Sequence, residues 1–250
     1  MNEIKTILFD AYGTVLDVGT YHRDITDYLA AQSHPLFGTT LSSDEFLLHW
    51  NEEFESAFMD VVGYCGEFKN LRDLFGISTK NVFRRYGIDL SARDVAAFSR
   101  IYKTMLDDAV MIIPSVLSTL ETLCANGYRL GMVSNGDTQE LLTHLGNARG
   151  FFEEIVTSEE LAVYKPHARI FHEALRRMGA RRETTAFVGD MITADVLGAQ
   201  AVGLTAIWYN RRHRPTKHGV VPDFEIHDMS EVLDILQAHA RVAAKKDAPT

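Results

Sequence analysis

The residue of this chain best placed for chemistry is an aspartate that ends an apolar run. Residues Ile4 to Phe9 have the composition of a short buried strand, and Asp10 follows them directly. Gly13, three residues later, allows the backbone a sharp turn. An Asp at the carboxyl end of a parallel strand lies where open α/β sheets bind ligands. The same carboxylate could cap a turn, so Asp10 alone leaves both interpretations open.

Polar side chains also follow three later predicted strands, either directly or after a short loop. They are Ser134 with Asn135, Lys165, and Asp190 with Asp195. Because the carboxyl ends of parallel strands lie at one edge of a sheet, we expect these side chains to lie close together. One polar strand end arises easily by chance, whereas four that carry Asp, Ser, Lys and Asp indicate a single site.

The elements between these residues predict the fold class. Apolar residues recur at helical spacing from Tyr21 to Asp108, with no strand signal. From Ile112 onward, predicted strands alternate with predicted helices, which indicates an α/β protein with a doubly wound parallel sheet. Because the helical block separates the first strand from the others, we predict a core domain of residues 1–16 and 111–250. Residues 17–110 are then an inserted helical cap domain.

The individual elements of the predicted core follow from the same patterns. Strands are expected at residues 4–9, 129–133, 152–157, 185–188, 205–208 and 223–226. Helices are expected at residues 115–125, 138–145, 168–178, 194–202 and 230–240. Aromatic stripes of the helical block, which include Tyr21, Trp50 and Phe54, are predicted to form its core.

The composition excludes several classes of protein. With 250 residues, 46% of them hydrophobic, the chain can bury one full core and carry an insertion. A net charge of -9 disfavours nucleic acid and anionic membranes as partners, and the short basic cluster Arg211–Arg214, with Lys217, is predicted to be a solvated loop. Two distant cysteines, Cys65 and Cys124, predict neither a disulfide framework nor a zinc site. Without a signal-peptide or membrane-spanning pattern, a cytoplasmic monomer or homodimer is expected.

With these motifs in this order, the chain resembles the haloacid dehalogenase (HAD) superfamily of hydrolases. The resemblance covers nearly the whole chain, through Asp10 to Thr14, Ser134-Asn135, Lys165, and Gly189 to Asp195. It implies a Rossmann-like core with a helical cap inserted between the first and second motifs. Together the four motifs are highly specific for this family.

The resemblance also implies a role for each residue. Asp10 would be a nucleophile that forms a covalent intermediate, which water then hydrolyses. Lys165 would neutralise charge on the nucleophile and on the transferring group, and Thr14 would form a hydrogen bond near the nucleophile. Substrate oxygens would be held by the hydroxyl of Ser134 and the main chain around Asn135, together with the turn at Gly13.

The residue two positions after the nucleophile favours one branch of the family. Phosphatases of this family carry an Asp there, which protonates the leaving alkoxide, a step worth roughly 10² to 10⁴ in rate. This chain has Tyr12, as in the L-2-haloacid dehalogenases, where a halide leaves without a proton. If a proton is needed, Tyr12, Asp17 and His22 are the nearby donors, and the sequence does not choose among them.

The fourth motif favours the other branch. The pair Asp190 and Asp195 is typical of magnesium-dependent members, whereas the dehalogenases work without metal. Three carboxylates against the single charge of Lys165 would raise one another's pKa, and a bound cation removes that cost. The resemblance implies Mg²⁺ held by Asp10, Asp190 and the main-chain carbonyl of Tyr12, with Asp195 bound directly or one layer further out.

These observations predict a magnesium-dependent phosphatase that acts on a small phosphorylated metabolite, hence on a small anionic substrate. An (S)-2-haloacid dehalogenase is the alternative. Asn51 stands near the place of the halide-binding arginine of that branch, which disfavours the alternative. A second alternative is a phospho-acceptor or binding module that uses Asp10 without turnover.

Overall fold

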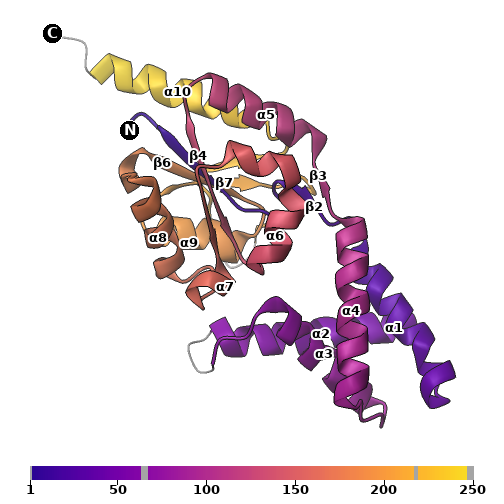
Figure 1. Cartoon of the computed structure of the whole chain (residues 1–250). Coiled ribbons are helices and arrows are strands. Elements are labelled where there is room, and N and C mark those ends of the chain that lie inside the picture. The colour runs from indigo at the N-terminus through magenta and orange to yellow at the C-terminus, as the bar shows by residue number, and fades with distance from the viewer. Residues whose placement is uncertain (1, 63–66, 217–218, 247–250) are drawn as a thin grey trace. The chain divides into compact units, whose positions relative to one another are not determined.

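The computed structural model describes residues 2–62, 67–216 and 219–246. The chain folds into two compact units. The core unit comprises Met1–Asp17 and Met111–Thr250, and the helical unit comprises Val18–Val110. The helical unit is therefore an insertion that follows the first strand of the core unit (Figure 1). Each unit is described below by itself.

A parallel sheet forms the centre of the core unit. Its strands are β1 (Thr6–Phe9), β4 (Arg129–Ser134), β5 (Glu154–Thr157), β6 (Thr185–Gly189), β7 (Thr205–Tyr209) and β8 (Phe224–Ile226). They are ordered β5-β4-β1-β6-β7-β8, and every neighbouring pair is parallel. All residues of β1 and β6 are buried, as expected of strands that are covered on both faces. The predicted doubly wound sheet is confirmed.

Helices cover both faces of this sheet. They are α5 (Pro114–Ala125), α6 (Thr138–Leu145), α7 (Ser158–Leu161), α8 (Ala168–Met178), α9 (Gly198–Ala201) and α10 (Glu231–Lys246). In Figure 1, α5 and α10 run along one side of the sheet, and α8 and α9 along the other. Leu8 of β1 shares a core cluster with Phe171 of α8 and Ala199 of α9. Both α6 and α8 have the bounds that the sequence predicted.

The helical unit contains four long helices in its described residues. They are α1 (Tyr21–Phe37), α2 (Ser43–Val62), α3 (Leu71–Arg85) and α4 (Ala92–Ala109). Ser91 opens α4 with a capping box, in which it exchanges hydrogen bonds with Asp94. Tyr21 and Trp50 are buried in the aromatic core of the unit, and Phe54 packs against that core. The prediction that these aromatic stripes form the core is confirmed.

A short ribbon joins the helical insertion to the core unit. Strands β2 (Leu16–Asp17) and β3 (Met111–Ile112) pair in antiparallel register, so the chain leaves and re-enters the core unit at one place. The side chain of Asp17 also accepts a hydrogen bond of 2.9 Å from Arg211, which follows β7. Neither strand was predicted from the sequence, because a strand of two residues is too short to show an alternating pattern.

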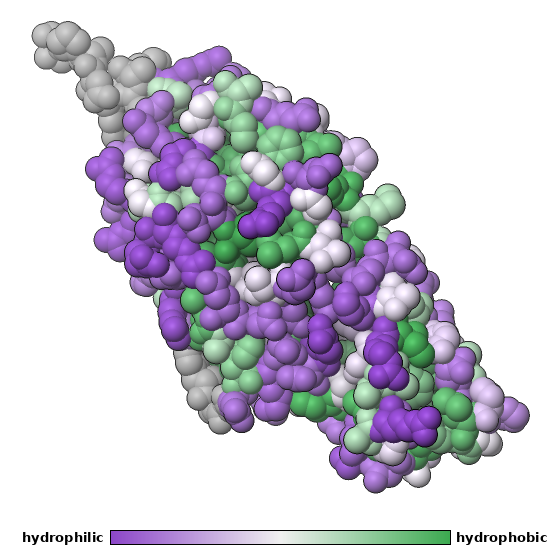
Figure 2. Space-filling model, in the orientation of Figure 1, coloured by the Kyte–Doolittle hydropathy of each residue, from purple (hydrophilic) through white to green (hydrophobic). Residues whose placement is uncertain are grey.

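The surface shows a mixture of polar and apolar residues. Figure 2 shows hydrophilic residues over much of the visible face, which fits the acidic composition. Within residues 2–62, 67–216 and 219–246, no helix combines the length and the apolar character needed to cross a membrane. Cys124 is exposed as a free thiol, and Cys65 lies outside the described residues.

Candidate active site

Asp10 lies near the centre of the sheet, directly after strand β1. Because β1 lies between β4 and β6, Asp10 has the polar ends of these two strands on either side. The amide of Asp10 donates a hydrogen bond of 2.9 Å to the carbonyl of Val188, and the side chain of Asp10 is buried.

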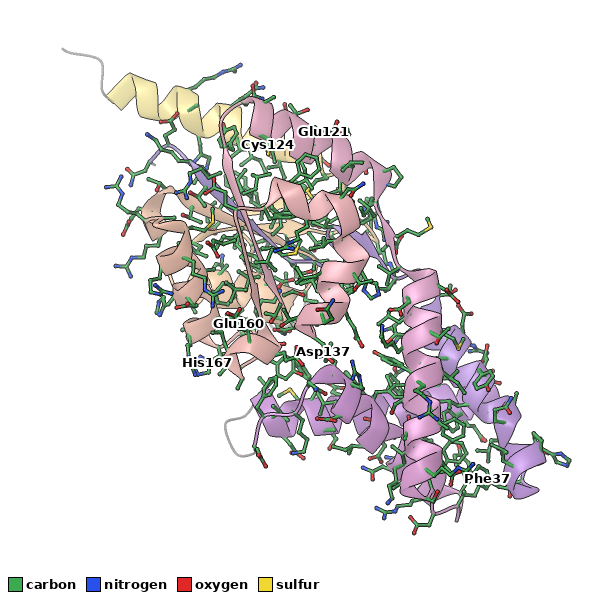
Figure 3. The ribbon with its side chains drawn as sticks, in the orientation of Figure 1. Phe37, Glu121, Cys124, Asp137, Glu160 and His167 are labelled. Carbon is green, nitrogen blue, oxygen red and sulfur yellow. The ribbon has the colours of Figure 1, made fainter. Side chains whose placement is uncertain are left out.

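Asp137, Glu160 and His167 gather at one edge of the core unit in Figure 3. These residues mark the start of α6, the short helix α7 and the start of α8.

Lys165 links three of the strand ends. Its ammonium donates to Asp10 Oδ1 at 2.6 Å, to Asp195 Oδ1 at 2.7 Å and to the carbonyl of Val133 at 2.9 Å. Only 1% of its side chain is exposed. Burial lowers the pKa of Lys165, but the charges of Asp10 and Asp195 outweigh that effect and raise the pKa overall. Lys165 is therefore a fixed, charged ammonium beside Asp10.

Asn135 holds the main chain of Lys165. The amide N–H of Lys165 donates to Asn135 Oδ1 at 2.7 Å, and Asn135 Nδ2 donates to the carbonyl of Lys165 at 3.2 Å. Both ends of the Asn135 amide are thus used within the protein. Only the main chain around Asn135 was predicted to bind substrate. The hydrogen bonds of the Asn135 side chain to the main chain of Lys165 were not predicted.

Asp195 is the second carboxylate partner of Lys165. Its Oδ2 accepts a hydrogen bond of 2.9 Å from the amide of Met191. A Cβ atom on Gly189 would lie only 2.4 Å from Asp195 Cγ, so this approach needs a glycine. Burial and the charges of Asp10 and Asp190, opposed by Lys165, raise the pKa of Asp195 to about 7.

A wide helical turn brings Asp195 to this place. The segment η3 (Ile192–Leu197) is a π-helix that precedes α9, so the single helix predicted at residues 194–202 is wrong in its first part. The amides of Asp195 and Val196 both donate to the carbonyl of Met191, at 2.8 and 3.3 Å. Turns of this kind are frequent at functional sites, and they follow from tertiary contacts that local periodicity does not encode.

Asp190 completes the cluster of carboxylates. Its Oδ2 accepts a hydrogen bond of 2.8 Å from Arg214, whose side chain is half-exposed. A Cβ atom on Gly13 would lie 2.7 Å from Asp190 Cγ, and Gly13 has a φ of +95°. Gly13 is therefore required both for the turn and for the approach of Asp190. Burial and the charge of Asp10, opposed by Arg214, raise the pKa of Asp190 to about 6.

Four buried oxygens of the site have no hydrogen-bond partner among the residues that the structure describes. They are Asp10 Oδ2, Asp190 Oδ1, Thr14 Oγ1 and Ser134 Oγ. A buried polar atom without a partner costs free energy, so such atoms point to a missing ligand. The predicted hydrogen bond of Thr14 near the nucleophile is not formed, and its hydroxyl remains available to a ligand.

The carboxylates form a group that fits a divalent cation. One oxygen from each of Asp10, Asp190 and Asp195 lies within 4.8 Å of the others. Carboxylate oxygens are the ligands that Mg²⁺ prefers, and the unpartnered oxygens belong to Asp10 and Asp190. Both oxygens of Asp195 are already used by Lys165 and Met191. The donor set therefore fits a magnesium ion best at Asp10 and Asp190.

Tyr12 lies next to the second motif. Its hydroxyl is hydrogen-bonded to His144 Nδ1 at 2.9 Å, and its ring edge would lie 3.1 Å from a Cβ atom on Gly136. The other two donors near the first motif have different surroundings. Asp17 is paired with Arg211, and desolvation lowers the pKa of His22 to about 4. His22 is thus neutral at neutral pH.

Arg214 is a site residue that the sequence analysis missed. The cluster of residues 211–214 was predicted to be a solvated loop, and residues 212–214 are exposed, but the ion pairs of Arg211 with Asp17 and of Arg214 with Asp190 were not predicted. Lys217, which was predicted with this cluster, lies outside the described residues. A signal was present in the sequence. The cluster follows the end of β7, the neighbour of β6, so the rule that placed Asp190 at the sheet edge applied to it as well.

Comparisons with known proteins agree with this architecture. The sequence profile of the haloacid dehalogenase-like hydrolases matches residues 4–203. The glyceraldehyde 3-phosphate phosphatase of Methanothermobacter thermautotrophicus is 37% identical over 242 residues, which cover 93% of this chain and 100% of that relative. The (S)-2-haloacid dehalogenase of Pseudomonas sp. strain YL is 26% identical over 251 residues, which cover 98% of this chain and 100% of that relative.

A solved structure shows the same fold. The HAD-hydrolase YfnB of Bacillus subtilis, determined with bound magnesium, matches with a TM-score of 0.76 and 21% identity. The match covers 95% of this chain and 100% of that chain. At this identity the likeness concerns the fold alone.

The fold thus defines an α/β protein with a parallel sheet and a helical insertion after its first strand. Because the profile and the relatives match most of the chain, the chain belongs to the haloacid dehalogenase-like hydrolases. The family resemblance drawn from the four motifs is confirmed. The phosphatase is more similar to this chain than the dehalogenase is, by 37% against 26% identity.

The raised pKa values of Asp190 and Asp195 predict a pH-dependent effect of magnesium on stability. Both pKa values rise from 3.8 in the unfolded chain to about 6 and about 7, so the folded protein binds protons more tightly. These two groups therefore lower the stability of the metal-free protein as pH rises from about 4 to about 7. Bound magnesium would replace those protons, so its stabilising effect should be larger at pH 7.5 than at pH 5.

Thermal unfolding in Mg²⁺ and in EDTA, at both pH values, measures this effect. The variant Asp190→Asn is the control, because it removes one of the two raised pKa values and one proposed ligand. Its midpoint should respond less to Mg²⁺ at pH 7.5 than that of the parent protein. An equal response of both proteins would contradict a magnesium site at Asp190.

Proposed function

We propose that this protein is a magnesium-dependent phosphatase that hydrolyses a small phosphorylated metabolite, with Asp10 as nucleophile. The observation that carries the proposal is the group of three carboxylates around one buried lysine. Asp10 and Asp195 share the ammonium of Lys165, while Asp10 and Asp190 each keep one buried oxygen without a partner. This arrangement supports a nucleophile that is held on one side and open to a ligand on the other.

Asp10 would transfer the phosphoryl group in two steps. In the first step a carboxylate oxygen of Asp10 forms a bond to phosphorus, and the bond between phosphorus and the ester oxygen breaks. In the second step water hydrolyses the aspartyl phosphate and releases phosphate, which restores Asp10. Lys165 keeps the carboxylate oriented through the hydrogen bond of 2.6 Å and offsets its negative charge.

Asp10, Asp190 and the main-chain carbonyl of Tyr12 would hold a magnesium ion. When bound, the ion would offset the repulsion between an anionic nucleophile and an anionic phosphate. Asp195, whose two oxygens are used, would act by fixing Lys165 and not as a direct ligand. Arg214, through its hydrogen bond to Asp190 Oδ2, would orient the Asp190 carboxylate.

The phosphoryl oxygens need donors that are fixed before the substrate arrives. The hydroxyls of Ser134 and Thr14 are buried and without partners, so we propose that they donate to the phosphoryl group together with the main chain at Gly13 and Asn135. Asn135 contributes further by holding the main chain of Lys165. Such preorganised donors stabilise charge that develops during the transfer.

The relatives support a substrate class. The Methanothermobacter thermautotrophicus relative, which this chain matches over 93% of its length, is named for glyceraldehyde 3-phosphate. We propose a phosphorylated metabolite of similar size, with residues 17–110 as the cap domain that selects it. A cytoplasmic location and a monomeric or homodimeric state stay predictions.

A dehalogenase activity is the second candidate, and Tyr12 is the observation that favours it. The dehalogenase branch also carries a Tyr two positions after the nucleophile. The Pseudomonas relative, which is named as a dehalogenase, is 26% identical to this chain. A third candidate is a module that accepts a phosphoryl group on Asp10 without turnover. The three candidates differ in their products and in their need for metal.

Product release in the presence and absence of a chelator separates the candidates. Phosphate release from p-nitrophenyl phosphate should require Mg²⁺ and stop in EDTA. Chloride release from 2-chloropropionate should be undetectable under both conditions. Asp10→Asn should abolish multiple-turnover phosphate release, because the amide is a poor nucleophile.

The opposite pattern of products would reject the phosphatase. Chloride release that survives EDTA, without any phosphate release, would establish the dehalogenase. Stoichiometric phosphorylation of Asp10 without turnover would establish the phospho-acceptor.

Tyr12 is the residue that could protonate the leaving group. Its hydroxyl is hydrogen-bonded to His144, and its ring lies beside Gly136, in the loop that follows Ser134. Asp17 is held in an ion pair with Arg211, which makes it a poor donor. We therefore propose that Tyr12, oriented by His144, supplies the proton that the Asp of other phosphatases supplies.

The variant Tyr12→Phe tests this role through the choice of leaving group. Turnover of an alkyl phosphate, whose alkoxide needs a proton, should fall by about 10² or more. Turnover of p-nitrophenyl phosphate, whose phenolate leaves readily, should change by less than about threefold on the same reasoning. His144→Gln, which removes the imidazole, should show a smaller loss for the alkyl phosphate. Equal losses for both substrates would show that Tyr12 is not the acid.

A further inference from the structure

A groove of about 660 Å³ lies between α3 and α4, entirely within the helical unit. None of the residues that form the carboxylate and lysine site of the core unit lines it. Its volume is in the range of sites that bind small molecules. Five cationic side chains line it, namely Lys69, Arg72, Lys80, Arg100 and Lys103.

The groove arises from the way two helices meet. On α3, residues 73, 76, 77 and 80 follow the spacing of one helix face, and residues 96, 99, 100 and 103 do the same on α4. A Cβ atom on Gly76 would lie 3.2 Å from Val95 Cγ1, so α4 packs closely against α3 where α3 lacks a side chain. Beyond this contact the lining carries long cationic residues, Arg72 and Lys80 on α3 and Arg100 and Lys103 on α4.

The charge of the groove is opposite to that of its surroundings. Residues 18–110 contain nine Lys and Arg against fourteen Asp and Glu. Five of the nine cations line the groove, with Asp73 as its one lining carboxylate. Like charges gathered in this way repel one another and focus a positive potential in the groove. An anion is the partner that would relieve this repulsion.

Two of the five lining cations have no ion pair within the described part of the chain. Lys103 pairs with Asp107 at 2.7 Å. Lys80 and Arg100, from opposite walls, have no ion-pair partner among the residues that the structure describes. Two cations on facing helices are therefore available to the same ligand.

Part of the lining is apolar. Ile77 of α3 and Val95 and Ala96 of α4 line the groove together with the cationic side chains. A bare inorganic ion would leave this surface in contact with water, whereas a ligand with an apolar body would cover it. We propose that the groove binds a phosphorylated organic anion of about nucleotide size, with its phosphate groups at Lys80 and Arg100.

Calorimetric titration of the full-length protein with ADP and with pyrophosphate, in EDTA, tests this site. The variant Asp10→Asn is used as the parent, so the result does not depend on whether the protein is a phosphatase. ADP should bind more tightly than pyrophosphate, because only ADP has an organic body that can cover the apolar part of the lining. Equal affinity would overturn the assignment of an organic ligand.

A pair of double variants locates the bound anion. K80Q/R100Q should weaken ADP binding by about tenfold or more, because two charge-assisted hydrogen bonds are lost. R84Q/R93Q removes the same charge from the helical unit outside the groove, and it should leave the Kd within about twofold on the same basis. Thermal unfolding midpoints establish that both variants are folded. Absence of ADP binding to the parent, or equal weakening by both double variants, would overturn the proposal.

The kinetic constants of the same variants test whether the groove binds a ligand that is separate from the enzyme's substrate. K80Q/R100Q should leave the KM for p-nitrophenyl phosphate unchanged in the otherwise unmodified enzyme. A rise in this KM that R84Q/R93Q does not share would overturn the assignment of the groove to a separate ligand.

Discussion

The site depends on a buried ammonium group that is shared between two carboxylates. Lys165 donates all three of its N–H bonds, to Asp10, to Asp195 and to the carbonyl of Val133. An unpaired charge at this depth would cost several kcal/mol, so the lysine is stable only because these acceptors surround it. The three acceptors come from β1, from β4 and from the turn after β6. One side chain thereby fixes the relative positions of three strand ends, and removal of either carboxylate would disturb all three.

The same interaction leaves the site with unbalanced charge. Three carboxylates lie together, and Lys165 and Arg214 offset only part of their charge. Arg214 reaches Asp190 from a half-exposed position, where solvent weakens its effect. Burial, together with this imbalance of charge, raises the pKa values of Asp190 and Asp195. A divalent cation at the unpartnered oxygens would remove it, which is why the geometry and the proposed chemistry agree.

Much of the fold could be predicted because it rests on local patterns. The helices Thr138–Leu145 and Ala168–Met178 have clear apolar periodicity and clear end signals, and the strand ends were readable as apolar runs that stop at polar residues. The parts that could not be predicted rest on contacts between distant segments. They include the amide of Asn135 on the main chain of Lys165, the π-turn at Asp195, and the two-residue strands β2 and β3. None of these features gives rise to a repeating pattern in the sequence.

Chemical trapping of the covalent intermediate tests the central claim most directly. Borohydride added to the enzyme during turnover of a phosphorylated substrate reduces an aspartyl phosphate to homoserine, and peptide mass spectrometry locates the change. The account predicts homoserine at position 10, dependent on Mg²⁺ and on substrate, and absent from the other aspartates. Turnover without any conversion of Asp10, or conversion of a different aspartate, would contradict Asp10 as the nucleophile.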